Sequence, residues 1–352
     1  MTSQNITLAD LGWNSFFAGQ LKIEENGLPV RVMAVHRDRL HVVGPEIDTL
    51  VSPFRESGEG NMAVATVGDW LLLDAQTARP SRLLRRRSLF KRRAAGTARN
   101  LQLIAANVDT LFIVSSCNQE FNPARLERYL AVAREAEVTP VIVLTKADAT
   151  DNTGEFVRKA QKLLPGLLVE AVDAREAQSV TCLTPWCSRG QTIALLGSSG
   201  VGKSTLVNTL AGHHLAQTQD IREDDAKGRH TTTGRTLCRL PAGGWLIDTP
   251  GMRELQLTDV AAGVDEVFAD IVSLARNCRF NDCRHQTEPG CAIQSAVELG
   301  KIEASRIKRW HKLAAEEAFN GARLAERNAH GRDFAKLTNK ARKAKKRARC
   351  DE

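Results

Sequence analysis

The sequence predicts a multidomain protein with a small N-terminal β-barrel, a doubly wound α/β domain and a mostly helical C-terminal domain. Three observations predict this fold class. Short apolar runs with turn signals occupy residues 1–98, strand-like and helix-like segments alternate through 99–258, and three cysteines and a histidine cluster within 259–352. At 352 residues and 42% hydrophobic composition, the chain is long enough for two or three domains, each with its own core.

Residues 1–98 are predicted to form a barrel of the oligonucleotide-binding (OB) type with a basic linker. Apolar and polar residues alternate over short segments separated by polar turns such as 36–39, although any small barrel gives this pattern. Strands are expected at 29–35, 40–43, 61–67 and 70–73.

Two segments of the chain are strongly basic, and the formal net charge is +8. Residues 79–99 carry nine lysines and arginines without an Asp or Glu, and basic residues recur through 336–349. A solvated loop and a solubilising tail are the ordinary explanations. The lack of interspersed acids favours contact with RNA phosphates instead.

Residues 99–258 are predicted to form the α/β domain, because buried-strand runs alternate there with helical spacing. Helices are expected at 123–137 and 204–210. Strands are expected at 108–114, 141–144, 167–172, 192–196 and 245–247.

A phosphate-binding loop follows the strand at 192–196. It fits the pattern G-x-x-x-x-G-K-[ST], in which backbone N–H groups and a helix N-terminus surround an anion. We expect Lys203 to contact the β- and γ-phosphates and to support catalysis, and Ser204 to bind Mg²⁺. The loop consists of Gly197, Ser198, Ser199, Gly200, Val201, Gly202, Lys203, Ser204 and Thr205.

A base-binding loop is predicted directly after the strand at 141–144, formed by Thr145, Lys146, Ala147 and Asp148. The Asp148 carboxylate can accept hydrogen bonds from guanine N1–H and its 2-amino group, a donor pair that adenine lacks. The loop therefore predicts GTP as the nucleotide. Asp173 and Ala174 follow the next strand, and the Ala174 N–H is a candidate donor to guanine O6.

A second magnesium and γ-phosphate element is the D-x-x-G motif at 248–251. Asp248 is expected to hold Mg²⁺ through water, and the Gly251 N–H to contact the γ-phosphate. A threonine of a switch segment, Thr231, Thr232 or Thr233, would complete the magnesium shell, and we assign Thr232.

The order of these motifs is unusual. The base loop comes first, the phosphate loop second and D-x-x-G last, which is a circular permutation of the order in ordinary small GTPases. Because chain termini in such domains often lie close together, the fold tolerates this rearrangement.

Hydrolysis is predicted to be slow without a partner. Met252 follows D-x-x-G where Ras-like enzymes carry the glutamine that orients the attacking water, and methionine cannot do this. His230 is the nearest polar candidate for a catalytic role, with a solvated loop histidine as the alternative.

A metal site is predicted from Cys278, Cys283, His285 and Cys291, which lie within fourteen residues of each other. Four soft ligands at this density fit one structural, tetrahedral Zn²⁺ per chain. A helix is expected at 297–320.

No run approaches the about 18 apolar residues of a membrane span, and the N-terminus lacks an export signal. The sequence therefore predicts a cytoplasmic protein without membrane association, which we expect to be a monomer.

Nearly the whole chain resembles the YjeQ/YloQ family of circularly permuted bacterial GTPases. Besides the base loop, phosphate loop and metal cluster, the resemblance rests on 67–70, 104–109, 228–233 and 248–253. It implies an OB barrel, a permuted GTPase domain and a zinc domain. It also implies action on 16S rRNA and the small (30S) ribosomal subunit during late maturation, with GTP hydrolysis to GDP stimulated by that subunit. Under the resemblance, His230 is the switch histidine that assists hydrolysis. Thr145 replaces the usual Asn, and Asp173 a commoner Ser.

Two other functions stand as alternatives. A metabolic P-loop kinase or ATPase is disfavoured by Asp148 and by the basic segments. A non-catalytic RNA-binding scaffold is disfavoured by the intact Lys203, Ser204 and Asp248.

Overall fold

The computed structural model describes residues 6–22, 26–56, 61–93, 101–215, 235–248 and 260–319. The chain divides into two compact units, Met1–Gln256 and Leu257–Glu352. The additional boundary predicted between residues 98 and 99 falls in a segment outside the described residues.

The first unit begins with an antiparallel sheet. After the one-turn helix α1 (Ser15–Ala18), its strands follow in the spatial order β3-β2-β1-β4-β5. The predicted hairpin at 36–39 is confirmed, since the His36 N–H donates to the Arg39 carbonyl at 2.9 Å. The strands are β1 (Gly27–Val35), β2 (Leu40–Gly44), β3 (Ile47–Val51), β4 (Trp70–Asp74) and β5 (Pro80–Leu83).

The strand predicted at 61–67 is wrong. Asn61–Ala63 form a 3₁₀ turn, η1, because side chains take the backbone groups that a strand would need. Arg86 donates to the carbonyls of Met62 and Val64, and the buried Asp69 carboxylate accepts from the Thr66 N–H. The OB barrel is not confirmed: within the described residues no hydrogen-bonded ladder joins β3 to β5. The five strands nevertheless enclose one apolar core that includes Val32, Leu71 and Leu83.

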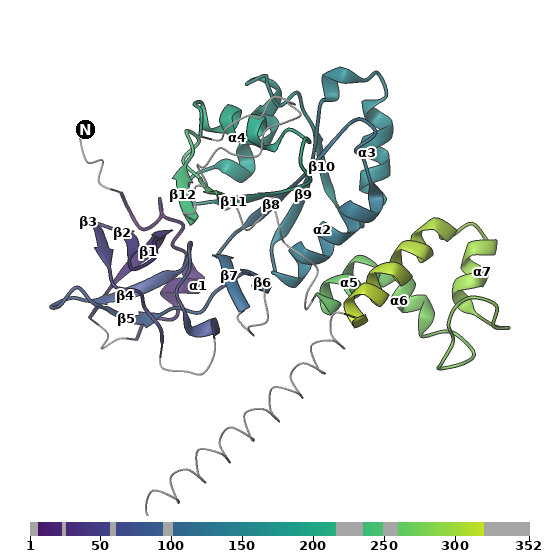
Figure 1. Ribbon diagram of the computed structural model, residues 1–352, viewed down its shortest axis with the longest axis horizontal. Helices are drawn as coiled ribbons and strands as arrows, with labels where there is room; N and C mark the ends of the chain where they lie inside the picture. The colour runs from purple at the N-terminus through teal and green to yellow at the C-terminus, as the bar shows by residue number, and fades with distance from the viewer. Residues whose placement is uncertain are drawn as a thin grey trace, which may run out of the picture. The chain divides into compact units, whose positions relative to one another are not determined.

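The α/β sheet is confirmed. Its spatial order is β10-β9-β8-β11-β13-β12, with all neighbours parallel except β12, which runs antiparallel to β13 (Figure 1). All parallel strands therefore end at one edge, which gathers the loops that follow them. The strands are β8 (Thr110–Ser116), β9 (Thr139–Thr145), β10 (Leu168–Ala171), β11 (Thr192–Leu196), β12 (Arg235–Arg239) and β13 (Trp245–Asp248).

Helices cover both faces of this sheet. Phe112, Val143 and Leu195 pack on one face in a core shared with α4 (Lys203–Ala211) and the 3₁₀ segment η3 (Ser179–Cys187). The other face contacts α2 (Pro123–Glu135) and α3 (Thr153–Gln161). Helix α2 starts where predicted, because Asn122 caps it and Pro123 has no N–H to satisfy.

The two sheets are continuous, which the sequence did not indicate. The end of β1 pairs with β12, so that Ala34 lies opposite Thr236. A separate hairpin of β6 (Leu89–Arg93) and β7 (Leu101–Ala106) leads from the N-terminal strands into the α/β sheet.

The second unit is helical in its described part, as predicted. It contains α5 (Ala261–Val267), α6 (Ala269–Ala275), α7 (Ala292–Glu298) and a helix over residues 304–319. The single helix predicted at 297–320 is wrong, because Gly300 has a φ of 67° and ends α7. Leu299 is consequently 69% exposed. In the part of the chain that is described, no helix has both the length and the apolarity to span a membrane.

Candidate functional site

The phosphate loop connects β11 to α4, in the middle of the parallel strands. Gly202 is the residue before α4 and has a φ of 91°, a conformation that favours glycine. The Lys203 ammonium lies against the loop itself, donating to the Gly197 carbonyl at 2.8 Å and to the Ser198 carbonyl. The loop therefore already holds a cation at the position where phosphate charge is expected.

Gly197 is required by a close approach of two strands. A Cβ at this position would lie 2.3 Å from the carbonyl oxygen of Val114 in β8, which is backbone and cannot rotate away. The first glycine of the motif therefore sets the distance between the phosphate loop and its neighbouring strand.

The base loop is tied to the phosphate loop by Thr145, the last residue of β9. Its side chain is fully buried, and its hydroxyl lies 2.5 Å from the Val201 carbonyl and 3.1 Å from the Ser115 carbonyl. The hydroxyl has one proton and donates to one of these oxygens at a time. The loop then turns at Lys146, with a φ of 57°, into η2 (Ala147–Ala149), which places Asp148 at the surface.

Asp148 and Asp173 are brought together by an arginine. The Arg175 guanidinium donates through Nη2 to Asp148 Oδ2 at 2.7 Å and to Asp173 Oδ2 at 3.0 Å. Its Nε donates to Asp173 Oδ1 at 3.1 Å. The hydrogen bond between Arg175 and Asp173 lowers the pKa of Asp173 and raises the pKa of Arg175. The carboxylate predicted to bind the base thus shares one cation with the neighbouring Asp173 carboxylate.

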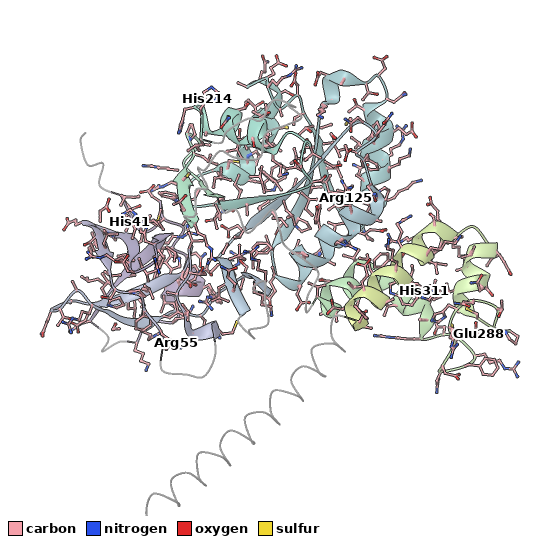
Figure 2. The ribbon with its side chains drawn as sticks, viewed as in Figure 1. His41, Arg55, Arg125, His214, Glu288 and His311 are labelled. Carbon is pink, nitrogen blue, oxygen red and sulfur yellow. The ribbon has the colours of Figure 1, made fainter. Side chains whose placement is uncertain are left out.

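Sequence reasoning missed two residues that touch the predicted site. Arg175 lies one position beyond the predicted Asp173 and Ala174, which was its only signal. Arg125, labelled in Figure 2, lies on the first turn of α2. It donates from Nη1 to the Ser198 hydroxyl at 2.8 Å. No motif marks Arg125, because its proximity depends on β8 and β11 being neighbours.

Several residues of the predicted nucleotide site fall outside the part of the chain that the structure describes. His230, Thr232 and Gly251 fall outside the described residues, as do Thr231, Thr233 and Met252. Asp248 is the last residue of β13, at the edge that carries the phosphate loop, but its side chain is not described.

Some arginines of the basic segment 79–99 form ion pairs within the fold. Arg86 forms a buried ion pair with Asp69 at 2.8 Å, and Arg87 pairs with Asp109 at 3.2 Å. Arg79 and Arg85 are exposed. The lysines and arginines after residue 335 lie outside the described residues.

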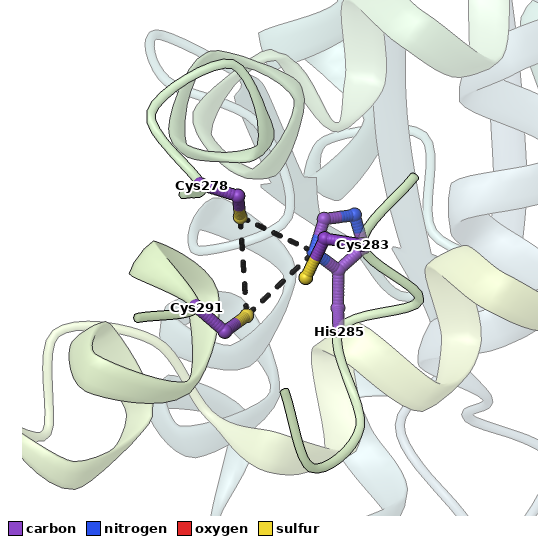
Figure 3. Close-up of side chains that lie close together, drawn as sticks. All are labelled: Cys278, Cys283, His285 and Cys291. Atoms are coloured by element: carbon purple, nitrogen blue, oxygen red, sulfur yellow. Dashed lines mark hydrogen bonds between the residues drawn. The ribbon is translucent and has the colours of Figure 1, made fainter. Parts of the chain in front are cut away.

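The predicted metal ligands are gathered in one place, as Figure 3 shows. Their ligand atoms all lie within 4.8 Å of one another. Cys278 Sγ lies 3.9 Å from Cys291 Sγ and 3.5 Å from His285 Nδ1, and Cys291 Sγ lies 3.7 Å from that nitrogen. Tetrahedral zinc with Zn–S bonds of about 2.3 Å separates its sulfurs by about 3.8 Å. The four residues therefore fit a tetrahedral metal ion.

The loop that carries these ligands is organised by Glu288. Its carboxylate accepts from the backbone N–H groups of Arg284 and Gln286, both at 2.9 Å, and these bonds lower its pKa to about 2. Burial lowers the pKa of His285, as does nearby His311, which favours the neutral imidazole that binds metals. Burial raises the pKa of Cys283 to about 11, so metal binding there must displace a proton.

Known proteins match this chain over nearly its full length. A model of the RsgA GTPase family matches residues 83–258. The protein named small ribosomal subunit biogenesis GTPase RsgA 2 from Vibrio parahaemolyticus is 52% identical over 340 residues, covering 96% of this chain and 93% of that protein. The chain belongs to the RsgA family of GTPases. A relative named small ribosomal subunit biogenesis GTPase RsgA from Mesorhizobium japonicum is 49% identical and covers 91% of this chain and 92% of its own length.

Solved structures support the fold of this RsgA family member. YjeQ from Thermotoga maritima matches with a TM-score of 0.61 at 24% identity, covering 82% of this chain and 98% of YjeQ. YloQ, described as a circularly permuted GTPase, matches with a TM-score of 0.57 at 19% identity, over 84% of this chain and 97% of YloQ. Family membership makes the protein a GTP hydrolase and rejects the metabolic kinase and ATPase alternative.

Proposed function

We propose that this protein binds the small ribosomal subunit and its 16S rRNA and hydrolyses GTP to GDP there during late maturation of the subunit. The observation that carries the proposal is the identity of about half of all residues with proteins named for small-subunit biogenesis, 52% over 96% of this chain. We propose that the subunit stimulates hydrolysis, because Met252 cannot orient water. We place this GTP hydrolysis in the cytoplasm and expect the protein to act as a monomer.

For the nucleotide site, we assign the phosphates to the loop Gly197–Thr205 and the guanine to Asp148. Lys203 already lies on the Gly197 carbonyl, from which it can move to a phosphate. The Thr145 hydroxyl, 2.5 Å from the Val201 carbonyl, sets the base loop against the phosphate loop. Lys146, Ala147, Asp173 and Ala174 would line the guanine. Mg²⁺, which accompanies GTP, would be held by Ser204, Asp248 and Thr232, with Gly251 at the γ-phosphate and His230 assisting hydrolysis.

For the second unit, we assign one structural Zn²⁺ to Cys278, Cys283, His285 and Cys291. Closed coordination by four protein ligands leaves no open position for a substrate, so the metal would stabilise the loop and take no part in hydrolysis.

For RNA binding, we assign residues 1–98 to an OB-type domain, 99–258 to the GTPase domain and 259–352 to the zinc domain with its basic tail. The single apolar core enclosed by β1 to β5 supports a small barrel-like domain, and the exposed Arg79 and Arg85 are available to phosphates.

The decisive experiment compares turnover of GTP and ATP with and without isolated small ribosomal subunits. We expect GTP turnover to rise at least tenfold with the subunits and to be lost in Lys203→Ala, because the Lys203 charge stabilises the transferred phosphoryl group. Lys159→Ala, an exposed lysine of α3 paired with Glu155, is the matched control. Equal GTP turnover with and without subunits would reject the proposed coupling.

A further inference from the structure

The carboxylate assigned to guanine is occupied by a side chain of the protein itself. Arg175 Nη2 donates to Asp148 Oδ2 at 2.7 Å. Asp173 holds the same guanidinium through two further bonds, from Nε at 3.1 Å and from Nη2 at 3.0 Å. The Arg175 backbone N–H also donates to Asp173 Oδ1 at 2.9 Å. Asp173 therefore anchors the arginine, and Nη2 still extends far enough to donate to Asp148.

The chemistry of Arg175 matches that of the expected ligand. Guanine presents to a carboxylate its N1–H and the amino group on C2, and these atoms with N3 form a cyclic guanidine. A guanidinium and this edge of guanine are both planar groups that present adjacent N–H donors. Guanine uses both carboxylate oxygens at once, so the bond from Arg175 to Oδ2 must break before guanine can bind in full.

We propose that Arg175 competes with guanine for Asp148 and thereby weakens binding of GTP and GDP. This inference rests on the proposed role of Asp148 in guanine recognition. When guanine binds, Arg175 keeps its bonds to Asp173 and gives up the one to Asp148. Asp173 is what holds the competitor in reach.

The size of the effect follows from the exposure of the pair. The side chains of Arg175 and Asp148 are 69% and 38% exposed, so the ion pair is well solvated. Exposed pairs contribute little, and losing this one on nucleotide binding should raise the dissociation constant by up to about fivefold. Salt screens exposed pairs, so the effect should shrink as ionic strength rises.

The test is calorimetric titration of the full-length protein with GDP and Mg²⁺. We expect Arg175→Ala to bind GDP about two- to fivefold more tightly than the wild type at low salt, with the ratio approaching one at about 1 M salt. The control is Arg158→Ala, an exposed arginine of α3 for which the structure shows no contact with Asp148. Weaker or unchanged GDP binding in Arg175→Ala would overturn the proposal.

The Asp148→Asn variant separates a failure of this inference from a failure of the proposed function. Xanthine carries a carbonyl at C2, so Asp148→Asn should exchange a preference for GDP for one for XDP, because the amide donates to that carbonyl. If Asp148→Asn fails to shift this preference, the assigned role of Asp148 is wrong, and the inference falls with it. If it shifts the preference, Arg175→Ala should leave XDP binding in this background unchanged within about 1.5-fold, since an uncharged Asn forms no ion pair with Arg175. Equal tightening there would show that Arg175 acts by another route.

Discussion

At the scale of single residues, Thr145 shows what a motif can and cannot predict. Its position at the end of β9 is predictable from the apolar run and the T-K-x-D pattern. The structure places its hydroxyl on the Val201 carbonyl, 56 residues further along the chain. Such a contact depends on two strands separated by β8 and cannot be derived from local sequence. Arg175 escaped prediction for the same reason, since its bond to Asp148 spans 27 residues.

Thr145→Val should weaken the connection between the two loops. Valine fills the same space but cannot donate, which leaves the Val201 carbonyl without this partner in a buried position. We expect the free energy of unfolding to fall by about 1–3 kcal/mol and GDP affinity to fall with it. Urea denaturation and GDP titration measure the two effects. Thr145→Ser, which keeps the hydroxyl, should stay close to the wild type in both, and equal losses in the two variants would contradict this role.

Gly197→Ala should disrupt nucleotide binding. The added Cβ would lie 2.3 Å from the Val114 carbonyl oxygen, so β11 or β8 must shift and the phosphate loop shifts with it. We expect the dissociation constant for GDP to rise at least tenfold, measured by calorimetry, in a protein that still shows native circular dichroism. Gly154→Ala in α3 is the control, because its Cβ would have only the flexible end of Arg158 nearby, at 3.4 Å. Unchanged GDP binding in Gly197→Ala would show that the loop tolerates the displacement.

At the scale of elements, long apolar runs were predictable, whereas segments with paired side chains were not. Strands β8, β9, β11 and β13 were expected within about two residues of their observed bounds, because burial on both faces requires continuous apolar runs. The run 61–67 has strand composition, yet the buried Asp69 and Arg86 take its backbone groups. The prediction of a single helix from residue 297 overlooked Gly300, whose left-handed conformation ends α7.

The loop that carries the proposed zinc ligands gives a prediction at this scale. Glu288→Ala removes the acceptor of the Arg284 and Gln286 N–H groups, which hold the loop around His285. We expect zinc to be lost to a competing chelator about tenfold more readily, as for other groups that orient metal ligands. Glu298→Ala, an exposed glutamate at the end of α7, is the control. Equal zinc retention in both variants would mean that the ligands hold the loop without Glu288.

The pH dependence of zinc retention has a definite sign. The pKa of Glu288 is lowered to about 2, so its stabilisation is complete above its ordinary pKa of 4.5 and is lost only as pH falls from there towards 2. The thiols must lose protons to bind zinc, so affinity should fall as pH falls from 8 to 5. The ratio between Glu288→Ala and wild-type affinities should therefore stay constant over this range, measured by chelator competition at each pH. A ratio that approaches one at pH 5 would contradict the assignment.

At the scale of the whole molecule, Arg31 joins parts of the first unit that are far apart in sequence. Its side chain is 1% exposed and donates from Nη1 to the Leu11 carbonyl at 2.6 Å and from Nη2 to the Thr192 hydroxyl at 2.7 Å. It thus connects the N-terminal segment, β1 and the first residue of β11, the strand that leads into the phosphate loop. The motifs predicted each domain alone, but this connection depends on the pairing of β1 with β12, which joins two predicted domains in one sheet.

Arg31→Met should uncouple the N-terminal strands from the α/β sheet. Methionine fills part of the volume but leaves the buried Leu11 carbonyl and Thr192 hydroxyl without the arginine, at a cost of about 1–3 kcal/mol for each polar group left unsatisfied. Burial lowers the pKa of Arg31 to about 10. Its charge, and hence its effect on stability, should therefore be constant from pH 5 to 9.

We expect the melting temperature to fall in Arg31→Met. We also expect GDP, whose proposed site lies in the α/β part alone, to protect the core of β1 to β5 less than in the wild type. Hydrogen exchange of β1 and β11 amides with and without GDP measures this coupling directly. In the wild type both strands should gain protection together, whereas in the variant only β11 should gain it. Arg79→Met, an exposed arginine next to β5, should behave as the wild type. Equal protection of β1 in both variants would show that the β1–β12 pairing couples the two sheets without Arg31.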